Sequence, residues 1–248
     1  MTVLEADKYY RLHIDSREEW QRVRNGKFKD HYLIGASESA KAVDHSPFGS
    51  SVDVYDEKVG GKIKDIAGLA SVRYGIEAEE PMRRLAMLDF GQWFQFSYAP
   101  YDIIVSKDTP CMSATLDGEI VVKTDDNPWE FPKGMKGVFE NKTGGMDHGA
   151  GDEWFMDHGK TIPPHYYLQG IHQLACTGYG FTLFQYRLKR EGYRDGEQEL
   201  PQISTGYRLL DRRAEGVEED IAWLRTQLMH FESEYLIPRV RPAQVFRF

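Results

Sequence analysis

The feature that most limits the fold of this chain is a change of hydrophobic period in its middle. Residues 68–89 place apolar side chains at helical spacing, although Pro81 predicts a break or restart of that helix. Further along, residues 101–106, 112–122 and 137–143 are rich in β-branched and aromatic residues, which predicts strands. Helices followed by a strand meander and then by further helices and strands indicate an α/β fold, with a central mixed β-sheet flanked by helices.

Weaker signals complete the expected order of elements. Asp15 or Ser16 is a suitable N-cap for a helix over residues 15–24, and Ser37 could cap a short helix through Val43. Other expected elements are a helix over 51–60, a helix from Pro163-Pro164 to about Thr177 and a strand over 181–188. We therefore expect one domain over residues 1–248, made of an N-terminal helical region (about 15–90), a β-rich core (about 100–190) and a C-terminal helix (about 210–235).

The composition excludes several classes of protein. With 248 residues, 41% of them hydrophobic, the chain can bury a core without disulfide support, which excludes collagen-like, fibrous and disordered chains. Cys111 and Cys176 could form one bridge, but reduced core thiols are expected of a cytoplasmic chain, and no apolar run is long enough to span a membrane. The net charge of −8 first argues against a nucleic-acid partner, because such domains are often basic.

Residues suited to catalysis gather in two of the expected strands, as Asp117 and as Glu140-Asn141-Lys142. Because side chains alternate along a strand, Glu140 and Lys142 point to one face, and Asp117 reaches the same place if the strands pair. Two carboxylates, with the carbonyl of Asn141 between them, could bind a hard divalent cation that polarises a phosphate and activates water. Lys142 could hold that water or offset the growing charge. An isolated Glu-x-Lys is usually a solvated surface pair, so this interpretation depends on further residues.

Three other segments could complete such a site. Glu79 or Glu80 in the long helix could add a carboxylate, although exposed helical glutamates are common. A helix with a Ser cap at Ser37 would be a natural phosphate site, to which Arg24 could add a bidentate contact, unless Ser37 is only a cap. The helix over 163–177 carries a polar stripe that faces either water or the site, formed by His165, Gln169, His172 and Gln173.

Together these segments resemble the family of phage lambda exonuclease and YqaJ-type viral recombinase nucleases, within the PD-(D/E)XK nuclease superfamily. The resemblance runs in order over about residues 18–190. It rests on WQRVRNG, IGASESAKAV and SPFGSSVDVYDEKVG near the N-terminus, RYGIEAEEPMRRL in the long helix, SATLDGEI and VFENKT in the strands, and YYLQGIHQLACTG in the later helix. Departures are the Asn between Glu140 and Lys142, a long loop after Asp117 and a long segment after Arg24.

The resemblance implies a role for each matching residue. Arg24 and Ser37 match positions that bind the 5′-terminal phosphate of DNA. Glu79 matches the glutamate of the family's helix, with Glu80 nearly equal as a candidate, and Gln169 matches the Gln of a Y-x-x-Q motif that begins at Tyr166 or Tyr167. The implied metal ligands and catalytic groups are Asp117, Glu140, Asn141, Lys142, Glu79 or Glu80, and Gln169.

The implied activity is that of a Mg²⁺-dependent deoxyribonuclease, with Mn²⁺ as a substitute, that resects double-stranded DNA from a 5′ end. The resemblance also implies a homo-trimer, a single-strand annealing partner, and a phage or prophage protein in the cytoplasm of a bacterial host. Two alternatives stay open: an endonucleolytic or repair-type nuclease of the same fold, and a non-catalytic DNA-end-binding protein, which the intact acidic and lysine set disfavours. A metal site explains part of the acidity, so we expect DNA to bind along a local basic track.

Aromatic residues in the expected loops also allow two interpretations. They could stack on unpaired bases at the cleft, or they could belong to a satellite core, which we favour slightly. These residues are Trp129, Phe131 and Trp154.

Overall fold

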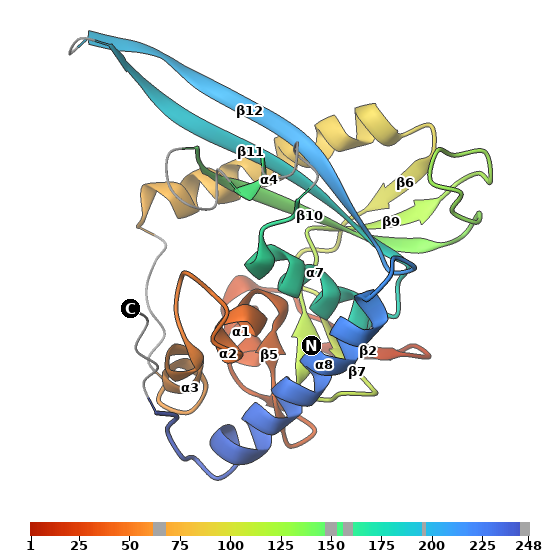
Figure 1. Cartoon of the computed structure of the whole chain (residues 1–248). Helices are drawn as coiled ribbons and strands as arrows, with labels where there is room; N and C mark the ends of the chain where they lie inside the picture. Colours follow the sequence, from red (N-terminus) through yellow and green to blue (C-terminus); the bar gives the residue numbers. More distant parts are fainter. Residues whose placement is uncertain (62–67, 147–152, 156–160, 195–196, 244–248) are drawn as a thin grey trace.

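Two mixed five-stranded sheets, with a helix between them, form the body of the protein (Figure 1). The computed structural model describes residues 1–61, 68–146, 153–155, 161–194 and 197–243. We name the sheets the N-terminal sheet and the C-terminal sheet after the positions of their strands in the chain. The architecture is α/β with mixed sheets flanked by helices, as the sequence predicts.

The N-terminal sheet joins the start of the chain to two strands from its middle. All neighbouring strands are antiparallel except the last two, which are parallel. A separate ribbon pairs β3 (Lys27–Phe28) with β4 (His31–Tyr32). The strands of the sheet lie side by side in the order β1 (Thr2–Glu5), β2 (Tyr9–His13), β7 (Ile103–Ser106), β8 (Met112–Ala114) and β5 (Ile34–Gly35).

The C-terminal sheet contains the longest strands, in the order β12 (Glu197–Asp211), β11 (Phe181–Arg194), β10 (Lys136–Gly145), β9 (Gly118–Val122) and β6 (Phe94–Ser97). β10 and β11 run parallel, and the other pairs are antiparallel. Within the described strands, β10 pairs with β9 only over residues 136–139, so one edge of β10 is free from Glu140 onward. The hairpin of β11 and β12 extends well beyond the body (Figure 1).

Helices cover both sheets and fill the space between them. The Ser16 hydroxyl caps α1 (Arg17–Arg24) by accepting from the Glu19 amide. α4 (Ala70–Phe90) packs on β10 and β6, and α7 (Pro164–Thr177) contacts β7, β8 and β11 from between the sheets. The other helical segments are η1 (Ala36–Glu38), α2 (Ser39–Ala42), α3 (Ser51–Lys58), α8 (Val217–Phe231) and the π-helical turn η2 (Glu232–Leu236).

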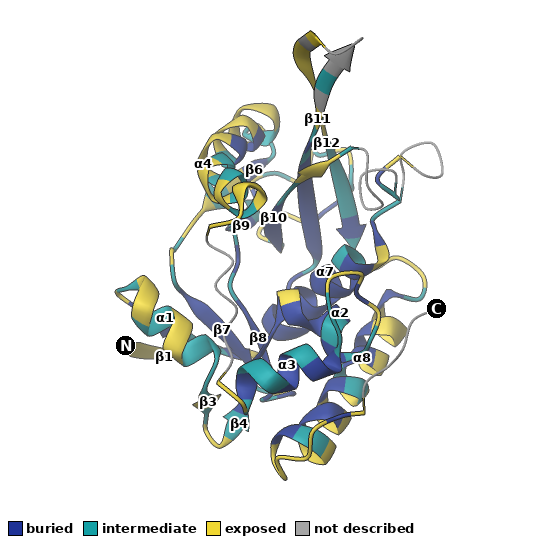
Figure 2. Ribbon diagram, turned by 90° about the vertical axis from the view of Figure 1, so that its left-hand side faces the viewer, coloured by how far each residue is buried: buried dark blue, intermediate teal, exposed yellow. Residues whose placement is uncertain are grey.

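Three apolar cores hold these layers together. The main core lies around α7 and α8, a second lies between α4 and the C-terminal sheet, and a small third core lies between α1 and the N-terminal sheet. Figure 2 shows the buried residues concentrated in the strands and in the inner helices, whereas much of α1 and α4 is exposed. Cys111 and Cys176 are buried free thiols, as expected. None of the described helices combines the length and apolar character that crossing a membrane requires.

The polar stripe of α7 is buried rather than solvated. Its members His165, Gln169, His172 and Gln173 are all at most 9% exposed. Burial lowers the pKa of His172 to about 4, and the Nε2 atom of this residue lies 3.0 Å from the carbonyl oxygen of Ser113. Of the two readings of the stripe, the one in which it faces water is therefore wrong.

The loop aromatics also belong to the core. Phe131 and Trp154 are both 1% exposed, and Trp129 stacks on Phe94 and Phe131. Phe131 and Trp154 therefore pack in the protein interior and Trp129 packs, partly buried, against the second core, which is the interpretation that we favour slightly.

Some expected boundaries are wrong for local physical reasons. α4 passes through Pro81 without a break, because this residue is exposed and the carbonyl that loses its helical partner can be hydrated. The single strand expected over 112–122 divides into β8 and β9, which lie in different sheets. The C-terminal helix begins at Val217, since residues up to Asp211 extend β12 and Gly216 adopts a left-handed conformation with φ of 84°.

The N-terminal region is also less helical than expected. The short strands β3, β4 and β5 lie within it, and α1, α2, α3 and α4 account for most of the rest. Ser37 is not the N-cap that we expected, because it lies inside η1 and the amide of Gly35 donates instead to the carboxylate of Glu38. The strand expected over 181–188 is the first part of β11, whereas the sequence carries no clear signal for the outer part of the long hairpin or for β6.

Candidate active site

One cavity between the two sheets receives almost every predicted site residue. Its volume is about 530 Å³. Its walls come from α1, η1 and β8 on the side of the N-terminal sheet, and from α4, β10 and α7 on the other side. The predicted residues that line it are Arg24, Ser37, Glu79, Asp117, Glu140, Asn141, Lys142 and Gln169.

β10 supplies the centre of this cavity at the point where its pairing with β9 ends. Glu140 and Lys142 share the face that looks toward α7, whereas Asn141 points toward α4, where its Nδ2 atom lies 3.3 Å from the Glu79 carbonyl oxygen. Asp117 precedes β9, and its Oδ2 atom accepts a 2.8 Å hydrogen bond from the amide of Asn141. The free edge of β10 therefore brings Asp117 beside Glu140, as the sequence predicts for paired strands.

Two glutamines of α7, one helical turn apart, bind the carboxylate of Glu140. The Nε2 atom of Gln169 donates to Oε1 and the Nε2 atom of Gln173 donates to Oε2, each at 2.6 Å. Lys142 donates to the same Oε1 at 2.7 Å and to the Oε1 atom of Gln169 at 2.8 Å. The orientation of Glu140 is thus fixed by three donors, two of them from α7.

Like charges and burial perturb the acids of the site. Burial, and then the nearby charge of Glu140, raise the pKa of Asp117 well above its ordinary value. Burial likewise raises the pKa of Glu79, against the effect of Arg83. Burial alone would lower the pKa of Lys142, but Glu140 and other neighbouring groups raise it overall, so this lysine stays positively charged at neutral pH.

The two candidate glutamates of α4 have different environments. Glu79 is half-buried and lines the cavity, and the charges of Glu140 and Lys142 act on it. Glu80 points to solvent, where its carboxylate pairs at 2.5 Å with the exposed Arg84 one turn along the helix. Glu80 is therefore outside the site, and the expectation that it rivals Glu79 is wrong.

The predicted phosphate contacts line the same cavity from α1 and η1, on the side of the N-terminal sheet. The Nη2 atom of Arg24 donates to the Ser37 hydroxyl at 2.7 Å, and the guanidinium lies over the ring of Trp20. Arg17, about two helical turns before Arg24 on α1, also lines the cavity. Among the described residues, the cavity thus contains three cations, Arg17, Arg24 and Lys142, together with the carboxylates of Glu79, Asp117 and Glu140. The basic track along which we expect DNA to bind stays a prediction.

The sequence alone did not single out several groups that shape the cavity. Gln173 was only one member of a polar stripe, and its spacing of four from Gln169 was the available signal. Arg83 donates to the Asp117 carbonyl at 3.0 Å and lies over the ring of Tyr98, which also lines the cavity. No pattern in the sequence distinguishes Arg83 and Tyr98 from ordinary surface residues.

The potential ligand atoms around Asp117 are oxygens, the element that hard divalent cations prefer. Asp117, Glu140 and Glu79 offer carboxylate oxygens, which such ions prefer. Across the described residues, the Oδ1 atom of Asn141 is buried without a hydrogen-bond partner, so the region holds an unused oxygen as well. No three His, Cys, Asp or Glu side chains in this part of the chain are close enough to form a ready-made metal site.

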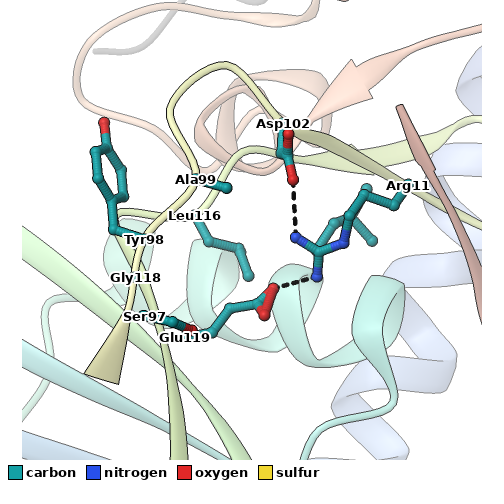
Figure 3. Close-up of a pocket in the computed structure, with 9 residues that line it drawn as sticks. Arg11, Ser97, Tyr98, Ala99, Asp102, Leu116, Gly118 and Glu119 are labelled. Atoms are coloured by element: carbon teal, nitrogen blue, oxygen red, sulfur yellow. Dashed lines mark hydrogen bonds and ion pairs between the residues drawn. The ribbon is translucent and has the colours of Figure 1, made fainter. Parts of the chain in front are cut away.

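A smaller cavity of about 220 Å³ lies next to this one and shares Tyr98 and Leu116 with it. Figure 3 shows Arg11 between Asp102 and Glu119, and Arg11 donates to both carboxylates. Because Arg11 lies on β2 and Glu119 on β9, this ion pair links the two sheets. Its charged groups are paired with one another, so we assign no ligand to this cavity.

The fold is that of a known class of nuclease. The structure of an alkaline exonuclease from Laribacter hongkongensis in complex with dAMP is 19% identical to this chain, with a TM-score of 0.52 over 88% of this chain and 93% of that chain. Another structure of the same exonuclease is 22% identical, with a TM-score of 0.49 over 90% and 97% of the two chains. The first of these similarities confirms the predicted α/β nuclease fold.

The family itself follows from the sequence match. The YqaJ-like viral recombinase domain matches residues 19–180, which is more than half of the chain. The protein belongs to the YqaJ-like viral recombinase family, and the predicted resemblance is confirmed. None of the curated proteins compared with the chain matches it.

Proposed function

We propose that this protein is a metal-dependent exonuclease that degrades double-stranded DNA from a 5′ end. One observation carries the proposal: a single cavity contains Asp117, Glu140 and Lys142 together with Arg24 and Ser37. A terminal 5′ phosphate and the first phosphodiester of the same strand can occupy the two ends of such a cavity. The viral recombinase family and the alkaline exonuclease fold support the same class of reaction.

Magnesium is the proposed cofactor, with Mn²⁺ as a substitute. Asp117, Glu140 and Glu79 would hold the ion through carboxylate oxygens, and bound there it would polarise a phosphate and lower the pKa of water. The main-chain carbonyl of Asn141 is a further donor. The N–H of that residue points to Asp117, and the N–H and C=O of one strand residue lie on the same side.

The remaining residues of the cavity would bind the substrate, act on it or orient the groups that do so. The positively charged Lys142 would hold the attacking water or stabilise the charge that develops on the phosphate. Gln169 would orient both Lys142 and Glu140, to which it is hydrogen-bonded. Arg24 and Ser37 would bind the terminal phosphate, and Arg17 extends the cationic surface next to them.

We further propose that the chain acts as one nuclease domain in a homo-oligomer, a trimer by family resemblance. It would work in the cytoplasm of a bacterial host with a single-strand annealing protein. Native mass spectrometry of the purified protein tests the oligomer, for which three copies are expected. Co-purification with a candidate annealing protein tests the partner, and a monomer that passes alone through both measurements would contradict this part of the proposal.

Digestion of linear duplex DNA with and without Mg²⁺ tests the activity. The protein should release nucleotides only with the metal, and Asp117→Ala and Lys142→Ala should each lower the rate by about a hundredfold or more. Closed circular DNA should stay intact, whereas nicking would indicate the endonucleolytic alternative. Binding of DNA ends without any metal-dependent digestion would indicate the non-catalytic alternative.

The neighbouring glutamates of α4 provide a matched pair of variants. Glu79→Gln should reduce Mg²⁺-dependent digestion by about tenfold or more, because it removes a proposed ligand charge. Glu80→Gln should leave the rate nearly unchanged, because that carboxylate pairs with Arg84 in solvent. Equal losses in the two variants would contradict the assignment of Glu79.

A further inference from the structure

A buried ion pair lies behind the proposed phosphate contacts. The Nζ atom of Lys58, on α3, is 2.9 Å from the Oε2 atom of Glu38, in η1. The Lys58 side chain is 0% exposed and that of Glu38 is 5% exposed. Removing two charges from water is costly, so a buried pair of this kind is weak support for stability by itself.

The pair ties together the two segments that carry the phosphate contacts. Glu38 accepts from the amide of Gly35 at 2.7 Å, which holds the start of η1 and therefore Ser37. Lys58 donates at 2.9 Å to the main-chain carbonyl of Arg24, at the end of α1. The pair thus contacts the main chain of Arg24 and that of Gly35, two residues before Ser37.

The distances also show how the charges are shared. Glu38 lies 2.9 Å from Lys58 but 4.0 Å from Arg24, and Arg24 donates instead to the neutral hydroxyl of Ser37. Lys58 is therefore the nearer cation to the buried carboxylate, and Arg24 forms only the longer of the two ion pairs with it, so its guanidinium can also bind an anion in the cavity. Without Lys58, Glu38 would attract Arg24 and would repel a phosphate at the same place.

We propose that Lys58 and Glu38 are positioning residues for the 5′-terminal phosphate. Lys58 neutralises Glu38, so that Arg24 remains available to the phosphate, and the pair makes the enzyme select phosphorylated ends. This inference rests on the proposed function, since it concerns the phosphate-binding end of the same cavity.

Two duplexes that differ only in a 5′ phosphate or a 5′ hydroxyl test the inference through the ratio of their kcat/KM values. Lys58→Met should lower the preference for the phosphorylated end by about tenfold, while the rate on the hydroxyl end changes by less than about threefold. The double variant Lys58→Met/Glu38→Gln, which removes both buried charges, should recover most of the preference. Arg241→Met is the matched control, because it breaks an exposed ion pair of α3 with Asp56 and should leave the ratio unchanged.

Thermal melting of each variant keeps the result interpretable. If Lys58→Met does not fold, the double variant decides alone: a near-normal preference supports the inference, and a lost preference overturns it. Equal loss in the single and double variants, or a loss of rate on both ends alike, would also overturn it, because either result indicates a merely structural pair.

Binding of the same two duplexes, measured by fluorescence anisotropy without added metal, separates this inference from the proposed function. If the protein binds phosphorylated ends selectively but digests no DNA with Mg²⁺, the proposed exonuclease activity is refuted. The roles of Lys58 and Glu38 are then still tested by the ratio of the affinities for the two duplexes. Absence of any preference in the wild-type protein, in both digestion and binding, overturns the inference itself.

Discussion

Replacing Gln173 tests whether α7 controls the carboxylate at the centre of the site. Gln173→Met keeps the length and volume of the side chain but removes its 2.6 Å hydrogen bond to the Oε2 atom of Glu140. Within the described residues this is the only hydrogen bond to that oxygen, while Oε1 keeps Lys142 and Gln169. The variant should therefore fold normally and hold Glu140 less firmly.

The expected loss follows from the energy of that hydrogen bond. A hydrogen bond to a charged group contributes about 1.5–3 kcal/mol. If this contribution is retained in the transition state, kcat/KM should fall by roughly 10- to 150-fold, at about 1.4 kcal/mol per factor of ten. The assay is nucleotide release from linear 5′-phosphorylated duplex DNA at several Mg²⁺ concentrations, with a melting curve for each protein.

Gln185→Met is the matched control for this prediction. Gln185 is also a buried glutamine, and its amide oxygen, like that of Gln173, has no hydrogen-bond partner in the described residues. Among the described residues, its side-chain amide donates to the Tyr207 hydroxyl at 3.2 Å and not to Glu140. Wild-type activity in folded Gln173→Met, or equal losses in the two variants, would refute the reasoning.

Two further predictions concern stability. Gly137→Ala should lower the free energy of unfolding by about 1–3 kcal/mol in urea titrations, because the added Cβ would lie 2.4 Å from the Phe181 ring. Gly144→Ala is the control on the same strand, because the atom nearest to its added Cβ is 3.5 Å away. Equal effects of the two substitutions would contradict the steric argument. The free energy of unfolding should also fall as the pH drops from 6.5 to about 4, because burial holds the pKa of His172 at about 4 while the unfolded chain takes up the proton near 6.5. His172→Gln should weaken this dependence by roughly 2–3 kcal/mol across that interval, and an unchanged slope would count against it.

The sequence predicts best where one segment carries several agreeing signals. The sequence predicts α7 almost to the residue, because a Pro-Pro pair marks its start and the side chains follow a helical period. The helix ends where Gly178 adopts a left-handed conformation with φ of 72°. The sequence also predicts that Asp117 reaches the place of Glu140 if their strands pair, and β9 does pair with β10. The start and period of a helix and the alternation of side chains along a strand are local properties, so the sequence of one segment is enough to predict them.

The remaining features depend on tertiary contacts that no local pattern encodes. The sequence over residues 189–204 is mostly polar, so it lacks the apolar alternation by which strands are predicted. The choice of Glu79 over Glu80 follows from the side of α4 that packs on β10, which two adjacent glutamates cannot reveal. The Lys58–Glu38 pair joins residues of α3 and η1 and becomes visible only when the fold is known.

The way in which the two sheets are joined has a consequence for the products of the reaction. Arg24 and Ser37 belong to the side of the N-terminal sheet, and Glu140 belongs to the other sheet. Residues 115–117 and the Arg11–Glu119 ion pair fix one sheet against the other. Under the proposed function, this junction sets the distance from the bound 5′ end to the phosphodiester bond that is cut. Loosening it should therefore change the number of nucleotides in each released product more than it changes the affinity for DNA.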